Sequence, residues 1–215
     1  MKKIFLYSSI AVLLMAFTHI VSRYQDGWIS LFDGKSLDGW KVGDNAPTFH
    51  ADSGMIIVHG NTAHLFYDGG VNQHHFKNFE FKADVMTRPG ANSGIYFHTE
   101  FQQAGWPQKG YEVQVNNSHT DWRRTGSLYG IKDVKEVYVK DNEWFTEYIK
   151  VVGKRVIIKL NDQTVVDYTE PENVSQQRGE DNSLRVISSG TFALQGHDPN
   201  SIVYFKNIVV KPLAD

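Results

Sequence analysis

The chain has 215 residues, enough for one or at most two domains, and 41% of them are hydrophobic, enough to bury a core. Its formal net charge of −2 shows no basic excess, which argues against nucleic acid as the main partner. There is no cysteine, so disulfides, thiolate metal sites and a cysteine nucleophile are excluded.

The first 22 residues are predicted to be a signal peptide. Lys2 and Lys3 form a short positive region, and the apolar stretch from Ile4 to Phe17 is shorter than the roughly 20 residues that a bilayer span needs. An uncleaved membrane anchor is the alternative. We expect an exported protein, periplasmic or secreted, with no membrane span after cleavage and with residues 23–215 forming a single domain; nothing in the sequence sets the oligomeric state.

Past this leader, short alternating segments separated by Gly, Asn and Asp are typical of β-strands. Asn161-Asp162 lies between two of them and predicts a hairpin, because both residues tolerate the positive φ of tight turns. Many short strands with turn signals between them indicate an all-β sandwich or barrel. Strands are expected at residues 55–59, 79–85, 111–115, 156–160, 164–168, 192–195 and 202–205.

Two longer loops flank the expected strand at residues 111–115. Residues 102–110 include Trp106-Pro107, and residues 116–130 include Trp122, Arg123 and Arg124. An aromatic ring beside arginines suits a loop that stacks on a ligand and clamps it, although a solvated charged loop is the alternative for the arginines.

Several segments, in a fixed order, resemble the 3-keto-disaccharide hydrolase domain family. The opening segment is Leu31–Trp40, LFDGKSLDGW. Later pieces of the pattern are 78–80 (NFE), 91–97 (ANSGIYF), 110–114 (GYEVQ), 125–129 (TGSLY), 143–144 (EW), 194–197 (LQGH) and 203–208 (VYFKNI). The resemblance covers residues 27–212, nearly the whole chain after the leader.

This resemblance implies a fold and a substrate class. The fold is a concanavalin-like jelly-roll sandwich of two curved antiparallel sheets, and the substrates are sugars oxidised at carbon 3. The chain departs from the family at His98, where many members carry Arg, and at Phe145, where Asn often follows the tryptophan. If either position touches substrate, the sugar or the leaving group differs here.

Strand alternation predicts which side chains face outward, because residues i and i+2 share a face. In residues 111–115, Glu112 and Gln114 should face away from the core. The same rule turns Tyr96 and His98 outward, and also residues 193, 195 and 197. If these strands are neighbours, their outward residues form one polar groove.

The candidate site follows from these faces and loops. Glu112 and His197 are the candidate catalytic residues, as a general base or an acid–base group. A solvated strand residue and a loop histidine are the structural alternatives. Candidate substrate-binding residues, each with a surface or core role as its alternative, are His98, Gln114, Arg124, Tyr129, Trp144 and Gln195.

No cofactor is firmly implied. His74 and His75 are adjacent and would point to opposite faces of a strand, and no His-x-His or His-Glu-x-x-His pattern occurs. Binding of a divalent ion by oxygen ligands from separate parts of the chain is the alternative. No nucleotide-binding glycine motif is present.

The sequence is compatible with three functions from different classes, all with a carbohydrate as the partner. The first is cleavage of 3-keto-glycosides by base-assisted elimination and hydration, a net hydrolysis. The second is a non-catalytic glycan-binding module. The third is an ordinary glucanase-like glycosidase, which needs paired carboxylates; Glu112 lacks an acidic partner on its own strand face, where Gln114 and Asn116 follow it.

Overall fold

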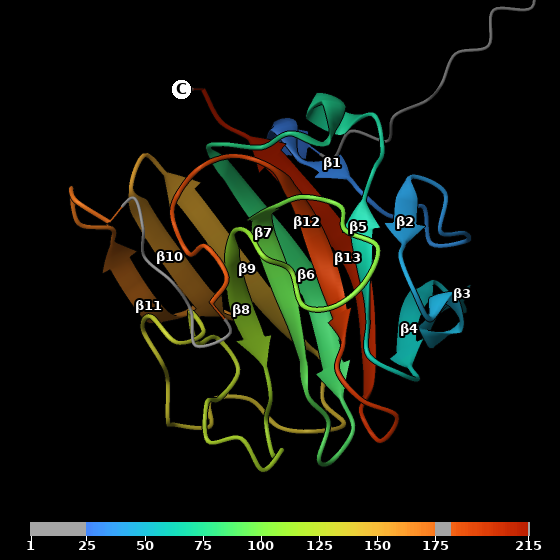
Figure 1. Cartoon of the computed structure of the whole chain (residues 1–215). Coiled ribbons are helices and arrows are strands. Elements are labelled where there is room, and N and C mark those ends of the chain that lie inside the picture. The colour runs from blue at the N-terminus through green and yellow to red at the C-terminus, as the bar shows by residue number, and fades with distance from the viewer. Residues whose placement is uncertain (1–24, 175–181, 215) are drawn as a thin grey trace, which may run out of the picture.

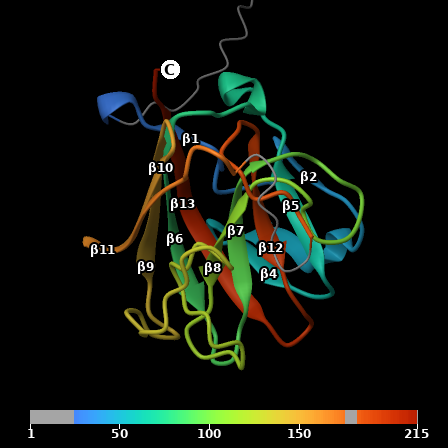
Figure 2. The same ribbon diagram turned by 60° about the vertical axis from the view of Figure 1, so that its left-hand side comes forward.

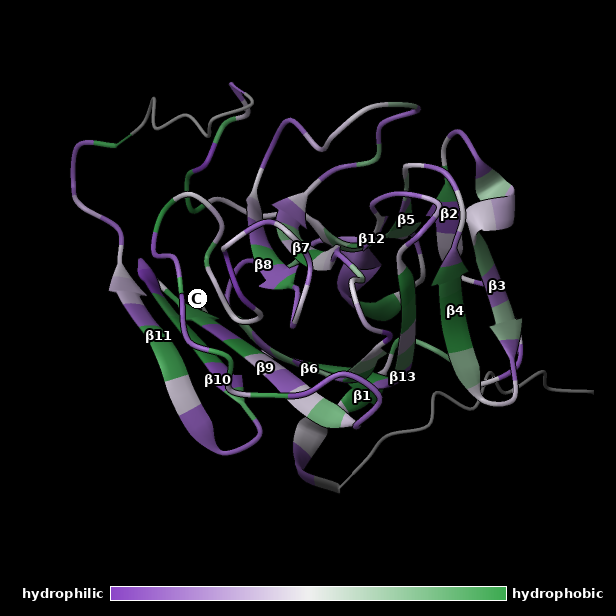
Figure 3. Cartoon of the chain, turned by 90° about the horizontal axis from the view of Figure 1, so that it is seen from below, coloured by the Kyte–Doolittle hydropathy of each residue, from purple (hydrophilic) through white to green (hydrophobic). Residues whose placement is uncertain are grey.

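The computed structural model describes residues 25–174 and 182–214, so the predicted signal peptide lies outside the described residues. These residues form two antiparallel β-sheets packed face to face (Figure 1). Figure 2 and the view from below in Figure 3 separate the two layers. Within the described ranges, no helix has the length and apolar character needed to cross a membrane.

The larger sheet has eight strands in the order β11, β10, β9, β6, β13, β4, β3, with β1 paired to β13. Its strands are β1 (Ile29–Ser30), β3 (Phe49–Asp52), β4 (Met55–His59), β6 (Phe79–Thr87), β9 (Phe145–Val152), β10 (Arg155–Leu160), β11 (Gln163–Thr169) and β13 (Ile202–Pro212).

The smaller sheet has five strands in the order β2, β5, β12, β7, β8. They are β2 (Trp40–Val42), β5 (Ala63–Tyr67), β7 (Ser93–Thr99), β8 (Tyr111–Val115) and β12 (Thr191–Gly196), and three short 3-10 helices lie in the connections, η1 (Gln25–Gly27), η2 (Ala46–Thr48) and η3 (Val71–His74). Because β12 lies between β5 and β7, segments about 100 residues apart in the chain become neighbours on one face.

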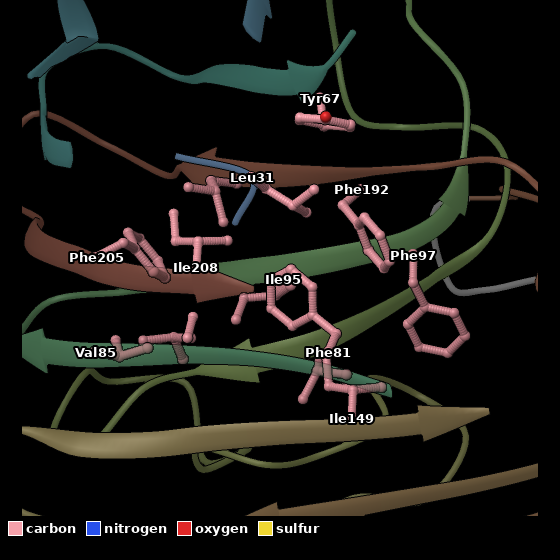
Figure 4. Close-up of a cluster of buried hydrophobic side chains, with 14 of the residues drawn as sticks. Leu31, Tyr67, Phe81, Val85, Ile95, Phe97, Ile149, Phe192, Phe205 and Ile208 are labelled. Atoms are coloured by element: carbon pink, nitrogen blue, oxygen red, sulfur yellow. The ribbon is translucent and has the colours of Figure 1, made fainter. Parts of the chain in front are cut away.

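The core lies between the sheets. Phe81 of β6 and Ile149 of β9 meet Ile95 and Phe97 of β7 and Phe192 of β12 there (Figure 4). All five side chains are fully buried. Each such apolar side chain stabilises the fold by roughly 1.5–3 kcal/mol relative to exposure, which lets a cysteine-free chain hold its shape.

The predicted strands and the two-sheet sandwich are confirmed. The hairpin of β10 and β11 turns at Asn161, whose φ is 53°. Tyr111 and Val113 of β8 point into the core, as alternation predicted, and Glu112 and Gln114 lie on the opposite, outer face.

The outer faces of the two sheets differ in their exposure to solvent. In β6 and β9 of the larger sheet, buried and half-buried residues alternate along most of each strand, so the outer face meets solvent. In β5, β7, β8 and β12 of the smaller sheet every residue is buried. The outer face of the smaller sheet is therefore covered by loops, and a polar face covered in this way is where a binding site can form.

Candidate active site

A pocket of about 380 Å³ opens on the outer face of the smaller sheet. Its floor comes from β7, β8 and β12, and its walls come from the loops that follow β7, β8 and β12 and from the segment before β12. The lining residues are Asn92, Tyr96, Trp106, Glu112, Gln114, Tyr129, Arg185, Gln195 and His197.

Glu112 lies at the centre of the floor and is 5% exposed. Its Oε2 accepts a hydrogen bond from the Tyr96 hydroxyl at 2.7 Å, and its Oε1 accepts one from Gln195 Nε2 at 2.8 Å. Gln195 Nε2 also lies 3.2 Å from the Tyr96 hydroxyl oxygen. Donors from β7 and β12 thus hold the carboxylate of β8 in a fixed orientation. Charge-assisted hydrogen bonds of this kind are the strong ones.

Gln114 adds a further donor. Its amide finds partners when the nitrogen faces the floor, where it donates to the Ser93 carbonyl at 3.1 Å and to Glu112 Oε1 at 3.2 Å. Gly94, paired with Gln114 across the strands, leaves room for the carboxylate, because a Cβ at Gly94 would lie 2.3 Å from Glu112 Oε1. The glycine in this strand is therefore required by the close approach of a side chain.

Tyr96 stays a neutral phenol. Burial, followed by the charge of Glu112, raises its pKa well above the usual range. Its proton therefore remains on the oxygen as the donor to Glu112. The Arg185 guanidinium lies 5.8 Å over the Tyr96 ring and donates to the Gly110 carbonyl at 2.9 Å, which brings a buried positive charge to the pocket wall.

His197 follows the end of β12 and pairs with its neighbour Asp198. Nδ1 of His197 lies 2.8 Å from Asp198 Oδ2. Although burial by itself raises the pKa of Asp198, hydrogen bonds from Ser201, His197 and the Asn200 backbone lower it to about 2. Asp198 is therefore ionised and accepts, so in the neutral imidazole of His197 the ring proton lies on Nδ1 and the lone pair on Nε2. A histidine held in this tautomer is suited to act as a base.

One cluster among the described residues has donor atoms suited to a metal ion, and it consists of His119, His197 and Asp198. In two of these residues, His119 and Asp198, side-chain atoms that could bind a metal already accept hydrogen bonds. Nδ1 of His119 accepts from the Asp121 backbone N–H at 3.1 Å, and Asp198 Oδ2 accepts from Ser201 as well as from His197. A metal ion there would have to replace hydrogen bonds that are formed.

The pocket brings together five of the eight residues predicted from the sequence, Glu112, Gln114, Tyr129, Gln195 and His197. Tyr129 is oriented by the Arg123 guanidinium, 4.6 Å from its ring, and its hydroxyl lies 3.4 Å from Asp121 Oδ2.

His98 does not reach the pocket, and the expectation that it faces outward with Tyr96 is wrong. The strand pairing shifts between Thr191 and Ala193 of β12, and His98 adopts a positive φ of 56°. This irregularity breaks the alternation. His98 lies buried against Phe79, accepts the Ser188 N–H at Nδ1 and donates from Nε2 to the Lys77 carbonyl.

Arg124 and Trp144 also lie outside the pocket lining. Arg124 donates to Asn116 Oδ1 and to the carbonyls of His119 and Asp121, so it fastens the loop after β8 from within. Trp144 precedes β9 of the larger sheet, and Lys206 Nζ lies 3.9 Å over its ring. Both placements depend on which strands become neighbours, which alternation alone does not specify.

Four residues at or beside the pocket were not predicted as site members: Asn92, Trp106, Arg185 and Asp198. Three carried a signal, and one of these, Trp106, lies in a loop predicted to flank the strand at residues 111–115. Asn92 belongs to the ANSGIYF segment, and Asp198 directly follows a histidine already under consideration. Arg185 carried none, because it reaches the pocket from the segment before β12, a region with no motif.

Comparison with known proteins places the chain among carbohydrate-related proteins. A family model described as a 3-keto-alpha-glucoside-1,2-lyase-like domain matches residues 27–211. A curated relative from Bacteroides thetaiotaomicron, named 3-keto-disaccharide hydrolase, is 28% identical over 171 residues, which are 66% of this chain and 59% of that protein. The chain thus spans less than two thirds of the relative's length.

Solved structures share the fold. A candidate glycosyl hydrolase from Parabacteroides distasonis matches with a TM-score of 0.73 at 23% identity, over 87% of this chain and 94% of its own. The laminarinase from Rhodothermus marinus matches with a TM-score of 0.54 at 11% identity, over 87% of this chain and 96% of its own. At these identities the likeness supports the jelly-roll architecture and says nothing about activity.

Proposed function

This chain belongs to the family of 3-keto-alpha-glucoside-1,2-lyase-like domains, and we propose that its pocket cleaves glycosidic bonds of sugars that carry a ketone at carbon 3. The chemistry begins at carbon 2, whose hydrogen is acidified by the neighbouring ketone. A base removes this proton and an enolate forms. The enolate expels the oxygen on carbon 1, which takes up a proton, and water then adds its hydroxyl to carbon 1 and its proton to carbon 2.

Such a reaction needs a base, a group that stabilises the enolate oxygen, and contacts that hold the sugar. The observation that carries the proposal is the His197–Asp198 pair at the pocket wall, 2.8 Å apart. It leaves Nε2 of His197 as the available base. We assign proton removal to this atom, with Asp198 as the residue that positions the ring.

The floor supplies the remaining roles. The carboxylate of Glu112 already receives hydrogen bonds from Tyr96, Gln195 and Gln114, which suits it to accept a sugar hydroxyl rather than to take the carbon-bound proton. The buried Arg185 guanidinium brings the positive charge that a developing enolate oxygen requires. Arg124 and His98, two of the predicted substrate-binding residues, lie outside the pocket lining and do not supply this charge.

An ordinary glycosidase is a poorer fit. Retaining and inverting enzymes both use two carboxyl groups flanking the bond that is cut. Glu112 is the single acidic residue in the pocket lining among the described residues. A base-initiated route through one histidine matches this lining better.

The decisive experiment is a product assay in deuterated water. Mature protein is mixed with a 3-keto-disaccharide and, separately, with the same unoxidised sugar. We expect monosaccharide from the keto form alone, with deuterium at carbon 2, because elimination and hydration exchange that position. Release without deuterium would indicate direct displacement. No release from either sugar would leave a glycan-binding module.

A histidine variant tests the base. His197→Asn is expected to lower kcat by about 10²–10⁴-fold, the usual contribution of a positioned acid–base group. The matched control is His50→Asn, because His50 is an exposed histidine on β3 of the other sheet. Wild-type kcat in folded His197→Asn would remove His197 from the role of base, and Glu112→Gln would then be the next variant to measure.

We further propose that the chain is exported, on the strength of the positive and apolar segments of its first 22 residues. Expression with and without these residues, followed by fractionation and N-terminal sequencing, tests this. A mature N-terminus near residue 23 in the exported fraction is expected, whereas an intact Met1 in the membrane fraction would indicate an anchor.

A further inference from the structure

The loop between β7 and β8, residues 100–110, covers one side of the smaller sheet's outer face. In Figure 1 it crosses in front of β12 toward β5. At its far end the Asp44 backbone N–H donates to the Gln103 carbonyl at 2.7 Å, and Gln103 Nε2 donates to Asp44 Oδ1 at 2.9 Å. The Phe101 ring packs edge-on against Phe66 of β5, with centroids 5.4 Å apart. The loop is thus fastened across the sheet by polar and apolar contacts.

The loop also packs closely against the residue that follows β2. A Cβ at Gly43, just beyond β2, would lie 2.0 Å from the Gln103 carbonyl oxygen. One partner in this contact is a Cβ and the other is a backbone oxygen, so neither can move aside by a change of side-chain rotamer. The loop therefore forms a fixed wall, and the pocket is confined to the part of the face above β7, β8 and β12.

Trp106 stands on the pocket side of this wall. Its carbonyl accepts hydrogen bonds from Gln102 Nε2 at 2.7 Å and from Gln108 Nε2 at 3.0 Å. Pro107 follows and restricts the backbone of Trp106 to extended conformations. The backbone of Trp106 is therefore held by the loop itself.

The indole ring is supported by two histidines and remains open to the pocket. Its centroid lies 5.4 Å from the ring of His64 and 5.5 Å from that of His197, yet Trp106 is 36% exposed. Burial, followed by the nearby His197, lowers the pKa of His64 to about 3, so this support stays neutral at ordinary pH. Because this aromatic surface is already ordered and partly exposed, little conformational entropy is lost when a ligand ring stacks on it.

We propose that Trp106 is the platform for the ring of the group that leaves from carbon 1. The proposal rests on the proposed function, since the bond that is cut defines the leaving group. His197, assigned to the proton on carbon 2, touches Trp106 directly, so a substituent on the adjacent carbon 1 lies within reach of the indole. The hydrogen-bonding floor around Glu112 lines the same pocket, and we assign the keto-sugar to it. Substrates whose leaving group carries a pyranose or aryl ring are therefore favoured over those that release a small alcohol.

The test compares a 3-keto-disaccharide with the 3-keto methyl glycoside of the same sugar. We expect Trp106→Ala to lower kcat/KM for the disaccharide by about 10- to 100-fold, the range for removing an aromatic anchor, and for the methyl glycoside by less than about 3-fold. Trp106→Phe should recover most of the loss. Equal losses on both substrates, or no loss on either, would overturn the proposal.

A second variant displaces the loop that carries Trp106 and leaves the Trp106 side chain itself unchanged. Gly43→Ala pushes on the Gln103 carbonyl and should reproduce the selective loss on the disaccharide. Gly70→Ala is the matched control, because a Cβ at Gly70 meets nothing within 4 Å. A Gly43→Ala protein that cleaves both substrates like wild type would contradict a fixed wall.

A binding measurement separates this inference from the proposed reaction. Tryptophan fluorescence is followed while the unoxidised disaccharide and its methyl glycoside are added to wild type and to Trp106→Phe. A disaccharide-specific change that is lost in the variant supports the platform even if no keto-sugar is cleaved, in which case the proposed reaction alone fails. Cleavage that is indifferent to Trp106 refutes the platform alone, and the absence of both signals refutes both.

Discussion

Gly94→Ala should disable the pocket floor by displacing the Glu112 carboxylate, without replacing any residue assigned to contact substrate. The added Cβ would lie 2.3 Å from Glu112 Oε1, whereas real Cβ contacts stay at 3.0 Å or more, so the carboxyl must move by about 0.7 Å. Its hydrogen bonds to Tyr96 and Gln195 are only 2.7 and 2.8 Å long, and a displacement of this size breaks at least one. A hydrogen bond to a charged group contributes about 1.5–3 kcal/mol, which predicts a loss of about 10- to 150-fold in kcat/KM.

The assay is kcat/KM on a 3-keto-disaccharide, with the melting temperature measured beside it. Gly70→Ala serves as the control, since its methyl group meets open space. Combining Gly94→Ala with Glu112→Asp shortens the displaced side chain and should recover part of the loss, a coupling that independent sites would not show. Wild-type kcat/KM in Gly94→Ala, or a double variant whose loss is simply the product of the two single losses, would show that the methyl group does not displace Glu112.

Three further outcomes are expected. Asp198→Asn should lower kcat about 100-fold or more by releasing the His197 tautomer, checked by kcat and by nitrogen NMR of the ring; an unchanged tautomer would contradict the pairing. Burial raises the pKa of Glu147, whose two oxygens have no hydrogen-bond partner in the described structure, so its contribution to stability is full below about pH 4 and is lost as pH rises. Glu147→Gln should flatten that part of the dependence of melting temperature on pH, and an unaltered slope would exclude Glu147 as its source. Treatment with a chelator should leave turnover unchanged, because His119 and Asp198 already form hydrogen bonds; a loss restored by a divalent ion would instead place a metal at their cluster.

The strands and their faces could be predicted because they depend on local pattern. Alternation of apolar and polar residues identified the strand at residues 111–115 and turned Glu112 and Gln114 away from the core, where the structure has them. The hairpin at Asn161 followed from the backbone preferences of its turn residues. Family resemblance added the topology that pattern alone does not provide.

Alternation could not predict two features, the irregularity at His98 and the placement of the loops. A single irregularity reverses every face beyond it, and the left-handed conformation of His98 turned that side chain from the outer face into a buried position. Loop residues have no periodicity at all, so Trp106 and Arg185 could be assigned to the pocket only once the loop after β7 and the segment before β12 were placed over the sheet.

The sequence by itself thus determined the strands, the sandwich class and the residues able to do chemistry, because these depend on side-chain type and on a period of two. Only the tertiary structure decided that Glu112, Gln195 and Tyr96 meet, because β12 inserts between β5 and β7 from about 100 residues away. It also decided how each of the two candidate bases is held. Hydrogen bonds from neighbouring strands occupy Glu112, whereas the Asp198 carboxylate leaves Nε2 of His197 as the acceptor.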